Sequence, residues 1–261
     1  MKPASLRAVL TGATGGIGCA LVEKLCQEGA HLLVVGRNAD ALGDLAQRFP
    51  DQVVAVQADI TVAEGRAAVL AATRHAGGVN ALINAAGVNR FLLLGQHTDD
   101  DIAQLIGLNV TSAMQLTRLM LPVLHQQQGA LVINLGSTFG SIGYPGFTAY
   151  CASKFALRGF SEALRREVAD TRTKVLYIAP RATRTAMNAA NVVALNRALN
   201  VTMDNPDDVA GLIVAAIRRE REESYFGWPE KLFVRLNGLL PRLVNQALRK
   251  QLPLIQQHVQ P

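Results

Sequence analysis

The sequence predicts an α/β fold in which a doubly wound parallel sheet of seven strands carries helices on both faces. Short β-rich runs alternate along the chain with longer segments at helical spacing, the pattern of a parallel sheet with crossover helices. Most of the short runs are continuously apolar, as strands buried on both faces are. Among 261 residues 49% are hydrophobic and 18% charged, which provides one large core and excludes a disordered chain.

Each element follows from its own segment. The predicted strands are Arg7–Leu10, Leu32–Gly36, Val53–Gln57, Ala81–Asn84, Ala130–Leu135, Lys174–Ile178 and Ser224–Trp228. The predicted helices lie near 16–28, 39–48, 62–75, 99–126, 150–169 and 206–221. Three consecutive acids, Asp99 to Asp101, suit the first turn of the fourth helix, and Asn205 followed by Pro206 suits the start of the sixth.

Charge and composition divide the chain into a body, residues 1–228, and an extension, residues 229–261. The net charge is +6, yet the body holds 21 basic and 19 acidic side chains, whereas the extension holds five basic and one acidic. A nearly neutral body without a reading motif argues against nucleic-acid binding. Three cysteines cannot frame a disulfide scaffold, and the five histidines show no metal-ligand spacing, so no metal site is expected.

A glycine-rich turn follows the first predicted strand and opens the first predicted helix. It reads Thr11-Gly12-Ala13-Thr14-Gly15-Gly16-Ile17-Gly18. Glycine lets the backbone approach a diphosphate closely, and the helix N-terminus offers free N–H groups and the positive end of a dipole. A tight glycine turn without a ligand has the same composition, so this segment alone is weak evidence.

Four further motifs accompany the turn, whose spacing is Gly-x3-Gly-x-Gly. They are Asn84-Ala85-Ala86-Gly87 after the fourth strand, Asn109 in Leu108-Asn109-Val110, Ser137 after the fifth strand, and Tyr150-Cys151-Ala152-Ser153-Lys154 thirteen residues beyond Ser137. Over roughly residues 5–228 the chain resembles the short-chain dehydrogenase/reductase family. The resemblance implies a Rossmann-type fold and a nicotinamide cofactor bound by the glycine turn (Gly12, Thr14, Gly15, Gly16, Ile17, Gly18) and by Asn84, Ala85, Ala86 and Gly87.

The same resemblance assigns catalytic roles to Asn109, Ser137, Tyr150 and Lys154. Ser137 would hydrogen-bond the substrate carbonyl, Tyr150 would protonate the developing alkoxide, Lys154 would hold the nicotinamide ribose, and Asn109 would order water for a proton relay. Tyr150 and Lys154 are four residues apart, so on a helix they share a face, and a nearby ammonium lowers a phenol pKa. Taken singly, each of the four is as readily a buried hydroxyl, a cap, a surface lysine or a helix polar residue.

The second strand indicates the cofactor. An acid at its end would accept the adenosine ribose hydroxyls of NAD, but here the strand ends at Gly36 and is followed by Arg37, whose guanidinium suits a 2′-phosphate. NADP(H) is therefore predicted ahead of NAD(H), with an exposed loop arginine that still accepts NAD as the alternative. The family likeness also places Asp59 and Ile60 beside the adenine.

One motif departs from the family, which has Pro-Gly-x3-Thr after the sixth strand. This chain reads Pro180-Arg181-Ala182-Thr183-Arg184-Thr185. Pro180, Thr183 and Thr185 keep the places that the resemblance assigns to nicotinamide and phosphate contacts. Arg181 replaces the glycine and is compatible with an acidic substrate, with the diphosphate or with solvent.

Two segments bear on the substrate and on partners. Residues 186–203 hold 12 apolar residues and a single charge, Arg197, which predicts either an apolar lid over an apolar substrate or a loop helix packed on the body. In the extension, apolar residues recur at helical spacing among basic ones, with Pro241 and Pro253 expected to break it into short helices. That pattern fits peripheral contact with a membrane surface, or packing against the body or a second subunit with the basic groups solvated.

The sequence thus predicts an NADP(H)-dependent oxidoreductase that interconverts a ketone and a secondary alcohol on a hydrophobic substrate: lipid-like, steroid-like or an acyl thioester. The alternative is a non-catalytic NADP-binding regulator that senses redox state. The short polar segment before the first strand does not resemble a targeting signal, so a cytoplasmic protein is expected. The family likeness implies a homodimer or homotetramer formed through the helices at 99–126 and 150–169.

Overall fold

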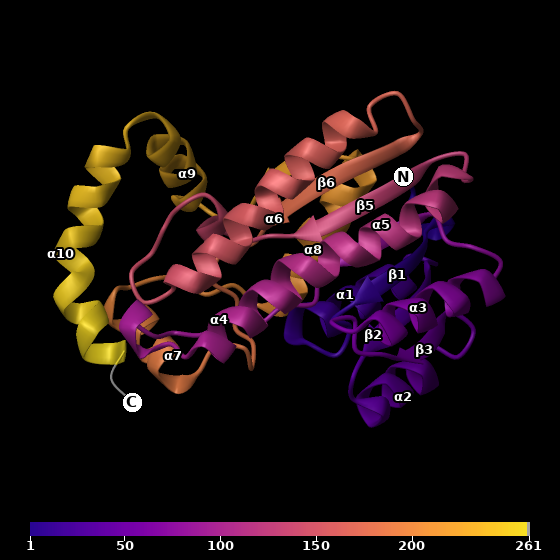
Figure 1. Cartoon of the computed structure of the whole chain (residues 1–261), viewed down its shortest axis with the longest axis horizontal. Coiled ribbons are helices and arrows are strands. Elements are labelled where there is room, and N and C mark those ends of the chain that lie inside the picture. The colour runs from indigo at the N-terminus through magenta and orange to yellow at the C-terminus, as the bar shows by residue number, and fades with distance from the viewer. Residues whose placement is uncertain (260–261) are drawn as a thin grey trace.

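A computed structural model describes residues 1–259 and shows a single seven-stranded parallel sheet with helices on both faces (Figure 1). The strand order is β3-β2-β1-β4-β5-β6-β7. The strands are β1 Arg7–Thr11, β2 His31–Gly36, β3 Val53–Gln57, β4 Ala81–Asn84, β5 Ala130–Leu135, β6 Thr173–Ala179 and β7 Glu223–Tyr225. The predicted fold class is therefore confirmed.

Ten α-helices are present in the described residues. They are α1 Gly16–Gln27, α2 Ala39–Arg48, α3 Ala63–His75, α4 Asp99–Ile106, α5 Ser112–His125, α6 Thr148–Glu167, α7 Ala190–Ala198, α8 Pro206–Arg219, α9 Glu230–Leu239 and α10 Pro241–Val259. Short 3₁₀ turns at Pro3–Ser5, Leu94–Gln96 and Thr138–Gly140 complete the connections. Among the described residues, no helix is long and apolar enough to cross a membrane.

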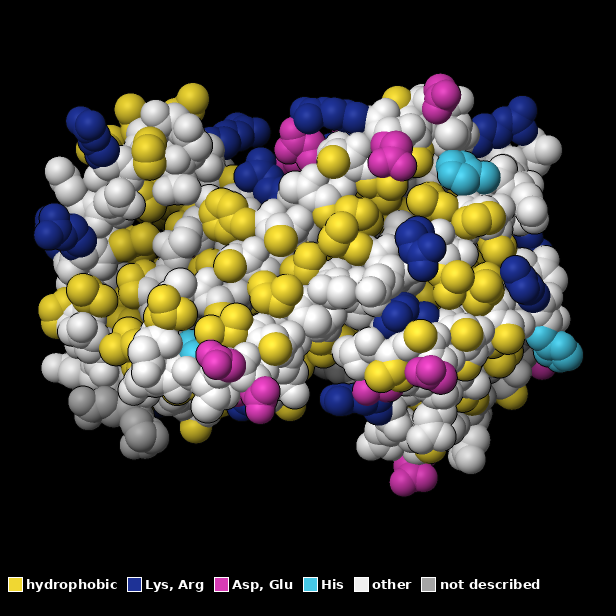
Figure 2. Space-filling model, viewed as in Figure 1, with side chains coloured by type: hydrophobic (Ala, Val, Ile, Leu, Met, Phe, Trp, Pro, Cys, Tyr) yellow, Lys and Arg dark blue, Asp and Glu magenta, His cyan; other side chains and the backbone are white. Residues whose placement is uncertain are grey.

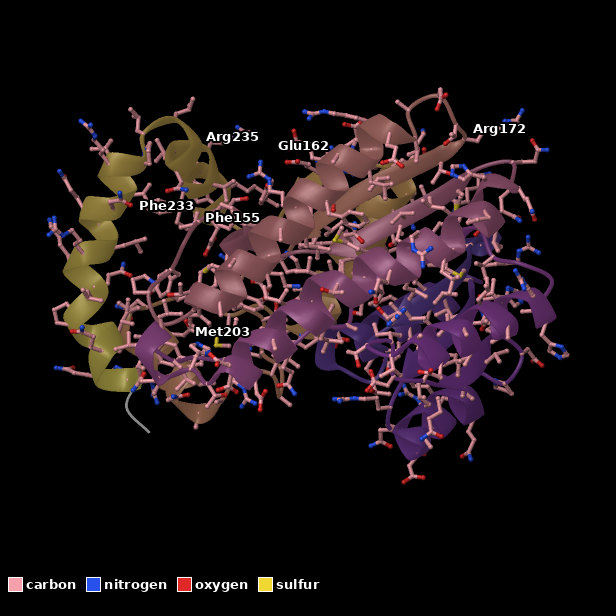
Figure 3. All side chains as sticks on the ribbon, in the orientation of Figure 1. Phe155, Glu162, Arg172, Met203, Phe233 and Arg235 are labelled. Carbon is pink, nitrogen blue, oxygen red and sulfur yellow. The ribbon has the colours of Figure 1, made fainter. Side chains whose placement is uncertain are left out.

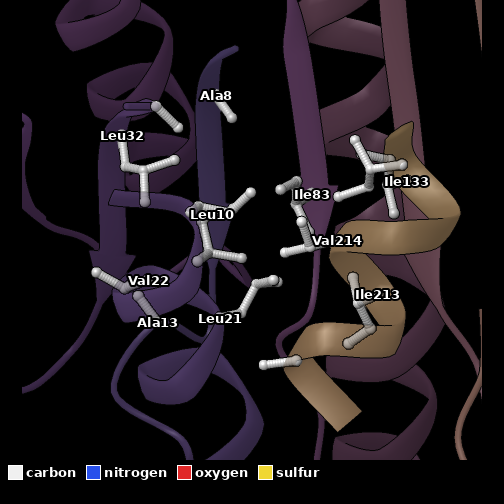
Figure 4. Packing of buried hydrophobic residues seen from close by; sticks show 14 of the residues in the cluster. Ala8, Leu10, Ala13, Leu21, Val22, Leu32, Ile83, Ile133, Ile213 and Val214 are labelled. Atoms are coloured by element: carbon white, nitrogen blue, oxygen red, sulfur yellow. The ribbon is translucent and has the colours of Figure 1, made fainter. Parts of the chain in front are cut away.

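The core has one cluster on each face of the sheet, because every central strand is apolar on both sides. On one face α1 and α8 pack against β1, β4 and β5, with Leu21 and Ile213 close to Leu10 and Ile83 (Figure 4). On the other face α3, α5 and α6 cover the sheet and bury side chains such as Met120. Neither cluster contains a residue of α9 or α10.

Strand β1 is the point at which the strand order reverses, since it pairs with β2 on one side and with β4 on the other. Leu10 is in register with both Val34 and Ile83. In such sheets a crevice opens beyond the carboxyl ends of the strands at the reversal, and ligands bind there. The predicted glycine turn and the turn after Asn84 leave the sheet at this edge.

The helix predicted over 99–126 is instead two α-helices joined by a π-helical turn, Gly107–Thr111. Its start agrees with the expected acids, and Thr98 and Asp101 form a reciprocal capping box. The π turn contains Asn109, whose buried amide makes three hydrogen bonds outside the helix. Those bonds offset the poorer backbone geometry of the turn, which helical periodicity cannot predict.

Strand β7 is shorter than the predicted Ser224–Trp228. It ends at Tyr225, and the chain turns away at Gly227, which adopts a φ of +89° that favours glycine. At the last predicted helix, Pro206 begins α8 as expected, but the Asn205 side chain makes no capping hydrogen bond there.

The extension folds into two helices, and only one of the two expected breaks occurs. Pro241 is the first residue of α10, a position that proline tolerates, but Pro253 lies inside α10 without ending it. The turn beyond Pro253 continues because it buries Ile255 and Val259 completely. Figure 1 shows α9 and α10 at the end of the molecule opposite α2 and β3, beside α7.

Candidate active site

A cavity of about 940 Å³ opens beyond the carboxyl ends of β1, β4, β5 and β6. Most of the predicted site residues line it. They are Gly12, Thr14, Gly15, Gly16, Ile17, Arg37, Asp59, Ile60, Ala85, Ala86, Gly87, Ser137, Tyr150, Lys154, Pro180, Thr183 and Thr185. Three predicted residues, Gly18, Asn84 and Asn109, lie behind this lining. The sequence motifs therefore converge on one cavity from separate parts of the chain.

The glycine turn forms a cradle whose backbone is packed too closely against its neighbours to admit side chains. Gly12 has a φ of +68°, and a Cβ there would lie 2.7 Å from Cα of Ala86. A Cβ on Gly16 would lie 2.6 Å from Cγ2 of Thr185, and one on Gly18 would collide with the carbonyl of Gly12. Helix α1 begins at Gly16 without a side-chain cap, so its first N–H groups face the cradle.

Asn84, predicted as a cofactor contact, lies behind the cavity lining and bonds to two other buried side chains. Its side-chain amide is buried and donates to Oγ1 of Thr117 at 3.1 Å and to Oδ1 of Asn134 at 2.8 Å. The motif's backbone is fixed by a residue that sequence reasoning did not single out: Oγ1 of Thr11 accepts from the backbone N–H groups of Ala85 and Ala86. Asn84 thus supports the cavity wall from within.

Helix α6 carries Tyr150 and Lys154 on one face, as their spacing predicts. The Lys154 ammonium is buried, donates to the carbonyl of Leu135 at 2.9 Å and lies 5.7 Å from the centroid of the Tyr150 ring. Burial raises the pKa of Tyr150 to about 12, against a smaller lowering by a hydrogen bond with Ser137, and burial lowers the pKa of Lys154 to about 8. Burial therefore shifts the phenol pKa in the direction opposite to the lowering expected from the nearby ammonium.

Asn109 is fixed behind Tyr150 and Lys154 by a closed set of hydrogen bonds. Its side chain accepts from the N–H of Val88 and donates to the carbonyl of the same residue, both at 2.9 Å. It also donates to Oγ of Ser153, which donates in turn to the carbonyl of Tyr150. Ser153 lies inside the Tyr-x3-Lys motif, yet its type alone gave no signal of this role.

Ser137 is held in the cavity wall by a second tyrosine. The Tyr177 hydroxyl donates to the carbonyl of Ser137 at 3.2 Å and accepts from its N–H at 3.4 Å, while Oγ of Ser137 accepts from the N–H of Phe139. The Tyr177 ring fills the space beside Gly136, where a Cβ would collide with it. The signal for Tyr177 in the sequence is weak, since it is one hydroxyl in an apolar strand.

At the other end of the cavity Arg37 stands near Asp59. Arg37 is exposed, and Gly36 beside it leaves space that reaches Oγ1 of Thr14. Hydrogen bonds from the hydroxyl and N–H of Thr61 hold the pKa of Asp59 below its usual range, and the charge of Arg37 adds to this. The described residues leave the Arg37 guanidinium without an ion-pair partner.

Arg181 pairs with the protein itself. Its guanidinium binds Asp204 through two hydrogen bonds, of 2.9 and 2.8 Å, and reaches Oε2 of Glu230 at 3.1 Å and the carbonyl of Trp228 at 3.2 Å. These carboxylates raise its pKa. Arg181 follows β6 and opens the loop of residues 181–205 that leads to α8. It ties this loop to α9, whereas the sequence had suggested an acidic substrate, the diphosphate or solvent as its partner.

A cluster of aromatic side chains lines one side of the cavity. Phe139 stacks on Tyr144, whereas Phe147 and Tyr150 meet their neighbours at tilted or edge-on angles, with ring centroids 5.0 to 6.4 Å apart. Helix α7 packs on this cluster through Val192 and Leu195. The 186–203 segment therefore contains the packed loop helix that was one of its two interpretations.

The extension also supplies part of the cavity wall, a role that sequence reasoning missed. Its lining residues are Glu230, Phe233, Val244, Ala247, Leu248 and Gln251. Gln251 accepts a hydrogen bond of 3.1 Å from the Tyr144 hydroxyl, and Ile255 and Val259 are buried in the aromatic cluster. Of the residues that the structure describes, no three metal-ligating side chains gather at one place.

Comparison with known proteins agrees with this geometry. A family model described as short chain dehydrogenase matches residues 7–195. The 3-oxoacyl-(acyl-carrier-protein) reductase of Haemophilus influenzae is 32% identical over 174 residues, which cover 66% of this chain and 72% of that protein. A 3α-hydroxysteroid dehydrogenase of Mediterraneibacter gnavus is 28% identical over 214 residues, which cover 78% and 86% of the two chains.

Solved structures resemble the whole chain. A short-chain dehydrogenase of Burkholderia cenocepacia in complex with NADP has a TM-score of 0.82 at 25% identity and covers 95% of this chain and 99% of its own. A short-chain dehydrogenase/reductase of Burkholderia phymatum in complex with NAD has a TM-score of 0.84 at 24% identity, with 93% and 96% covered. The second likeness bears on the fold alone.

Proposed function

Since the chain belongs to the short-chain dehydrogenase/reductase family of oxidoreductases, we propose that it uses NADP(H) to interconvert a ketone and a secondary alcohol on a hydrophobic substrate. The observation that carries the proposal is the convergence of Ser137, Tyr150 and Lys154 on one cavity, with an arginine at its far end and an apolar wall near the tyrosine. In this arrangement residues 1–228 are the catalytic domain, and 229–261 are an extension that completes the substrate side.

The residues present fit a nicotinamide dinucleotide. The cradle presents bare backbone to the cavity at Gly12, Gly15 and Gly16, and it meets the N-terminus of α1, which favours a diphosphate. Asp59 and Ile60 would flank the adenine, Gly87 and Lys154 the nicotinamide ribose, and Thr183 and Thr185 the carboxamide and phosphate. The exposed guanidinium of Arg37 would bind the 2′-phosphate that distinguishes NADP from NAD.

In reduction the bound cofactor supplies a hydride to the carbonyl carbon. The chain's own residues polarise and protonate the carbonyl oxygen. Ser137, fixed by Tyr177, donates a hydrogen bond to the carbonyl oxygen and polarises it. Tyr150 is protonated at neutral pH, because its pKa lies near 12, and it gives its proton to the developing alkoxide. Lys154 holds the ribose hydroxyls and passes protons towards the tyrosine, and Asn109 orders the water behind it.

The substrate side of the cavity supports the hydrophobic class. Its wall combines the stacked aromatic rings with Phe233, Val244 and Leu248 of the C-terminal helices. Apolar walls exclude water and accept alkyl or ring systems, such as lipid-like, steroid-like or acyl-thioester ketones. Both named relatives fit this class, since one is a reductase of 3-oxoacyl groups and the other a hydroxysteroid dehydrogenase.

The proposal extends to assembly and location. Met114 on α5 and Phe155 on α6 are more than two-fifths exposed, and this supports a homodimer or homotetramer through these helices; Phe155 is labelled in Figure 3. The enzyme would work in the cytoplasm, with residues 229–261 as its peripheral contact with a membrane surface.

Replacing Tyr150 tests the mechanism. In a screen of NADPH oxidation across ketones graded by chain length and charge, Tyr150→Phe is expected to reduce kcat by about 10²- to 10⁴-fold, the usual worth of a general acid, and to leave NADPH binding intact. Tyr144→Phe is the matched control, since Tyr144 lines the same cavity and its hydroxyl binds only Gln251 in the described residues. Equal activity of Tyr150→Phe and the wild type would refute the proposed mechanism.

A further inference from the structure

The outer side of α9 and α10 presents apolar and basic side chains together; we name these residues the C-terminal corner. Its apolar members are Trp228, Leu232, Phe233, Leu239, Leu240 and Leu243, each at least 40% exposed. Its basic members are Lys231, Arg235, Arg242, Arg249 and Lys250, all exposed. Scattered apolar residues are normal on a protein surface, but six exposed within sixteen residues mark a contact surface.

Leu232 and Leu239 share a side of α9, since they are seven residues apart and seven residues make two helical turns. Arg235 lies three residues after the first leucine and four before the second, so it belongs to the same side. Figure 3 shows Phe233 and Arg235 leaving α9 on different sides. Leu240 follows the last residue of α9, and Leu243 lies in the first turn of α10.

No acid neutralises the cations of the corner. The single acid between residues 229 and 259 is Glu230, which is bound to Arg181. Within the described part of the chain, none of the five basic members forms an ion pair. Figure 2 shows dark blue and yellow side chains over α9 and α10, and no magenta on that part of this face.

The inner side of the two helices is fastened to the body, so the corner stays turned outwards. Asn237 donates to the carbonyl of Ser141 at 2.9 Å, and Tyr144 donates to Gln251 at 3.1 Å. Val244, Ile255 and Val259 are buried. The exposed apolar side chains are therefore free to contact a partner outside the chain.

We propose that the C-terminal corner docks on an anionic lipid bilayer and that the hydrophobic substrate enters the cavity from that bilayer past Phe233. The entry of substrate from the bilayer rests on the proposed function, whereas the docking of the corner on the bilayer does not. An amphipathic surface with unpaired cations complements anionic lipid in both its apolar and its charged part. A symmetric contact with a second copy would instead bring the same five cations against one another. Phe233 joins the two halves of the proposal, since it is exposed and also lines the cavity.

Docking is tested on the full chain without substrate, by flotation with vesicles of phosphatidylcholine alone and with added phosphatidylglycerol. We expect binding to the anionic vesicles only, weakened by salt. Replacing Lys231, Arg235 and Arg242 by Gln should weaken binding to the anionic vesicles by about fivefold for each charge removed. The double variant Leu239→Gln with Leu240→Gln should weaken the same binding by about tenfold or more. Two matched control variants lie on the body. One replaces Lys2, Arg74 and Arg219 by Gln, the other replaces Val54 and Val62 by Gln, and both should bind the vesicles as the wild type does.

Two results would overturn the docking. One is equal vesicle binding by the corner and control variants. The other is a corner variant that changes the sedimentation of the free protein but not its vesicle binding, which assigns the corner to a second copy of the chain.

The entrance is tested by comparing two ketones, one short and water-soluble and one long-chain and dissolved in the anionic vesicles. The Leu239 and Leu240 variant should keep the rate on the soluble ketone and lose about tenfold on the vesicle-borne one. Equal loss on both would refute delivery from the bilayer. Absence of any NADPH oxidation by the wild type would refute the proposed function and leave the flotation result standing.

Discussion

Lys154 and Tyr150 lie side by side on α6, and burial shifts their pKa values in opposite directions. Burial disfavours the charged form of each, so the lysine loses its proton more readily and the phenol less readily than in water. The pair therefore consists of an ammonium that is charged near neutral pH and a phenol that is ready to donate. Both states are the ones that ketone reduction requires.

The shift of Lys154 predicts the alkaline limit of the reaction. As pH rises through about 8, Lys154 loses the proton that makes it a cation and a donor, so kcat/KM for reduction should fall by about tenfold per pH unit above that value. The phenol, with its higher pKa, does not set this limit. A pH profile of NADPH oxidation measures it, and Lys154→Arg, which stays charged, should move the limit upwards. An unmoved limit would assign the titration to another group.

We propose that Arg37 governs the choice between NADP(H) and NAD(H). Arg37→Asp removes the guanidinium and introduces a charge that repels a 2′-phosphate, and charge-assisted hydrogen bonds are worth about 1.5–3 kcal/mol. The ratio of kcat/KM for NADPH to that for NADH should fall by about 10- to 100-fold. Arg74→Asp, at another exposed position, is the control and should leave the ratio unchanged. The same ratio in both variants would make Arg37 an ordinary surface charge.

At the scale of elements, the substrate side of the cavity is an assembly of a loop and two helices around Arg181. The 181–205 loop begins at this residue and returns to it at Asp204, and α9 starts beside it at Glu230. All three side chains are less than one quarter exposed, so their charges are poorly screened. Arg181 is a positioning residue for the wall that faces the substrate.

Replacing Arg181 should loosen that wall while sparing the chemistry. Arg181→Ala leaves two half-buried carboxylates without their cation, which we expect to cost about 2–3 kcal/mol of unfolding free energy, discounted for partial exposure. KM for a hydrophobic ketone should rise more than kcat falls, and proteolysis should reach the 181–205 loop sooner. Arg48→Ala breaks an ion pair of exposed partners and should cost under about 1 kcal/mol. A kcat loss without a KM change would contradict the positioning role.

Elements with a regular apolar period were predictable, and those set by tertiary contacts were not. The seven strands and most helices of the body follow from local patterns, but α7 was expected only as one of two interpretations of its segment, and β7 ends earlier than predicted because Gly227 turns the chain. The π turn at Asn109 depends on hydrogen bonds to Val88 and Ser153, which are distant or unmarked in the sequence. The same holds for the partners of Arg181 and for Pro253, whose helix continues because distant side chains bury the following turn.

At the scale of the whole molecule, the two ends of the cavity have different origins. The cofactor side comes from the sheet edge and its turns, supported by core clusters that contain no residue beyond Phe226. The substrate side comes from α7, α9 and α10 around a third cluster. The motifs predicted residues of the first side, most of which line the cavity, whereas the second side has no motif and was unpredictable from pattern alone.

Removing residues 229–261 should separate these two halves. The truncated chain keeps both core clusters that sandwich the sheet, so it should fold and bind NADPH, as measured by circular dichroism and by nucleotide fluorescence. It loses Ile255 and Val259 from the aromatic cluster and Phe233, Val244 and Leu248 from the wall. Turnover of long-chain ketones should therefore fall by at least about tenfold. Full activity of the truncated chain on such ketones would show that the wall is dispensable.

The contribution of one contiguous stretch, α9 and α10, to the substrate wall has a consequence for how such enzymes diverge. We expect that a gene segment encoding these two helices can be exchanged between relatives without altering the glycine turn, whose support lies in the sheet, whereas Tyr150 packs against the cluster of Ile255 and Val259 and needs a matching α10. Substrate specificity can then change in evolution while the residues that bind the cofactor are kept. The body and the exchanged segment meet at the ion pair between Arg181 and Glu230. A chimera that keeps this pair should hold the new helices against the body, with different side chains lining the cavity.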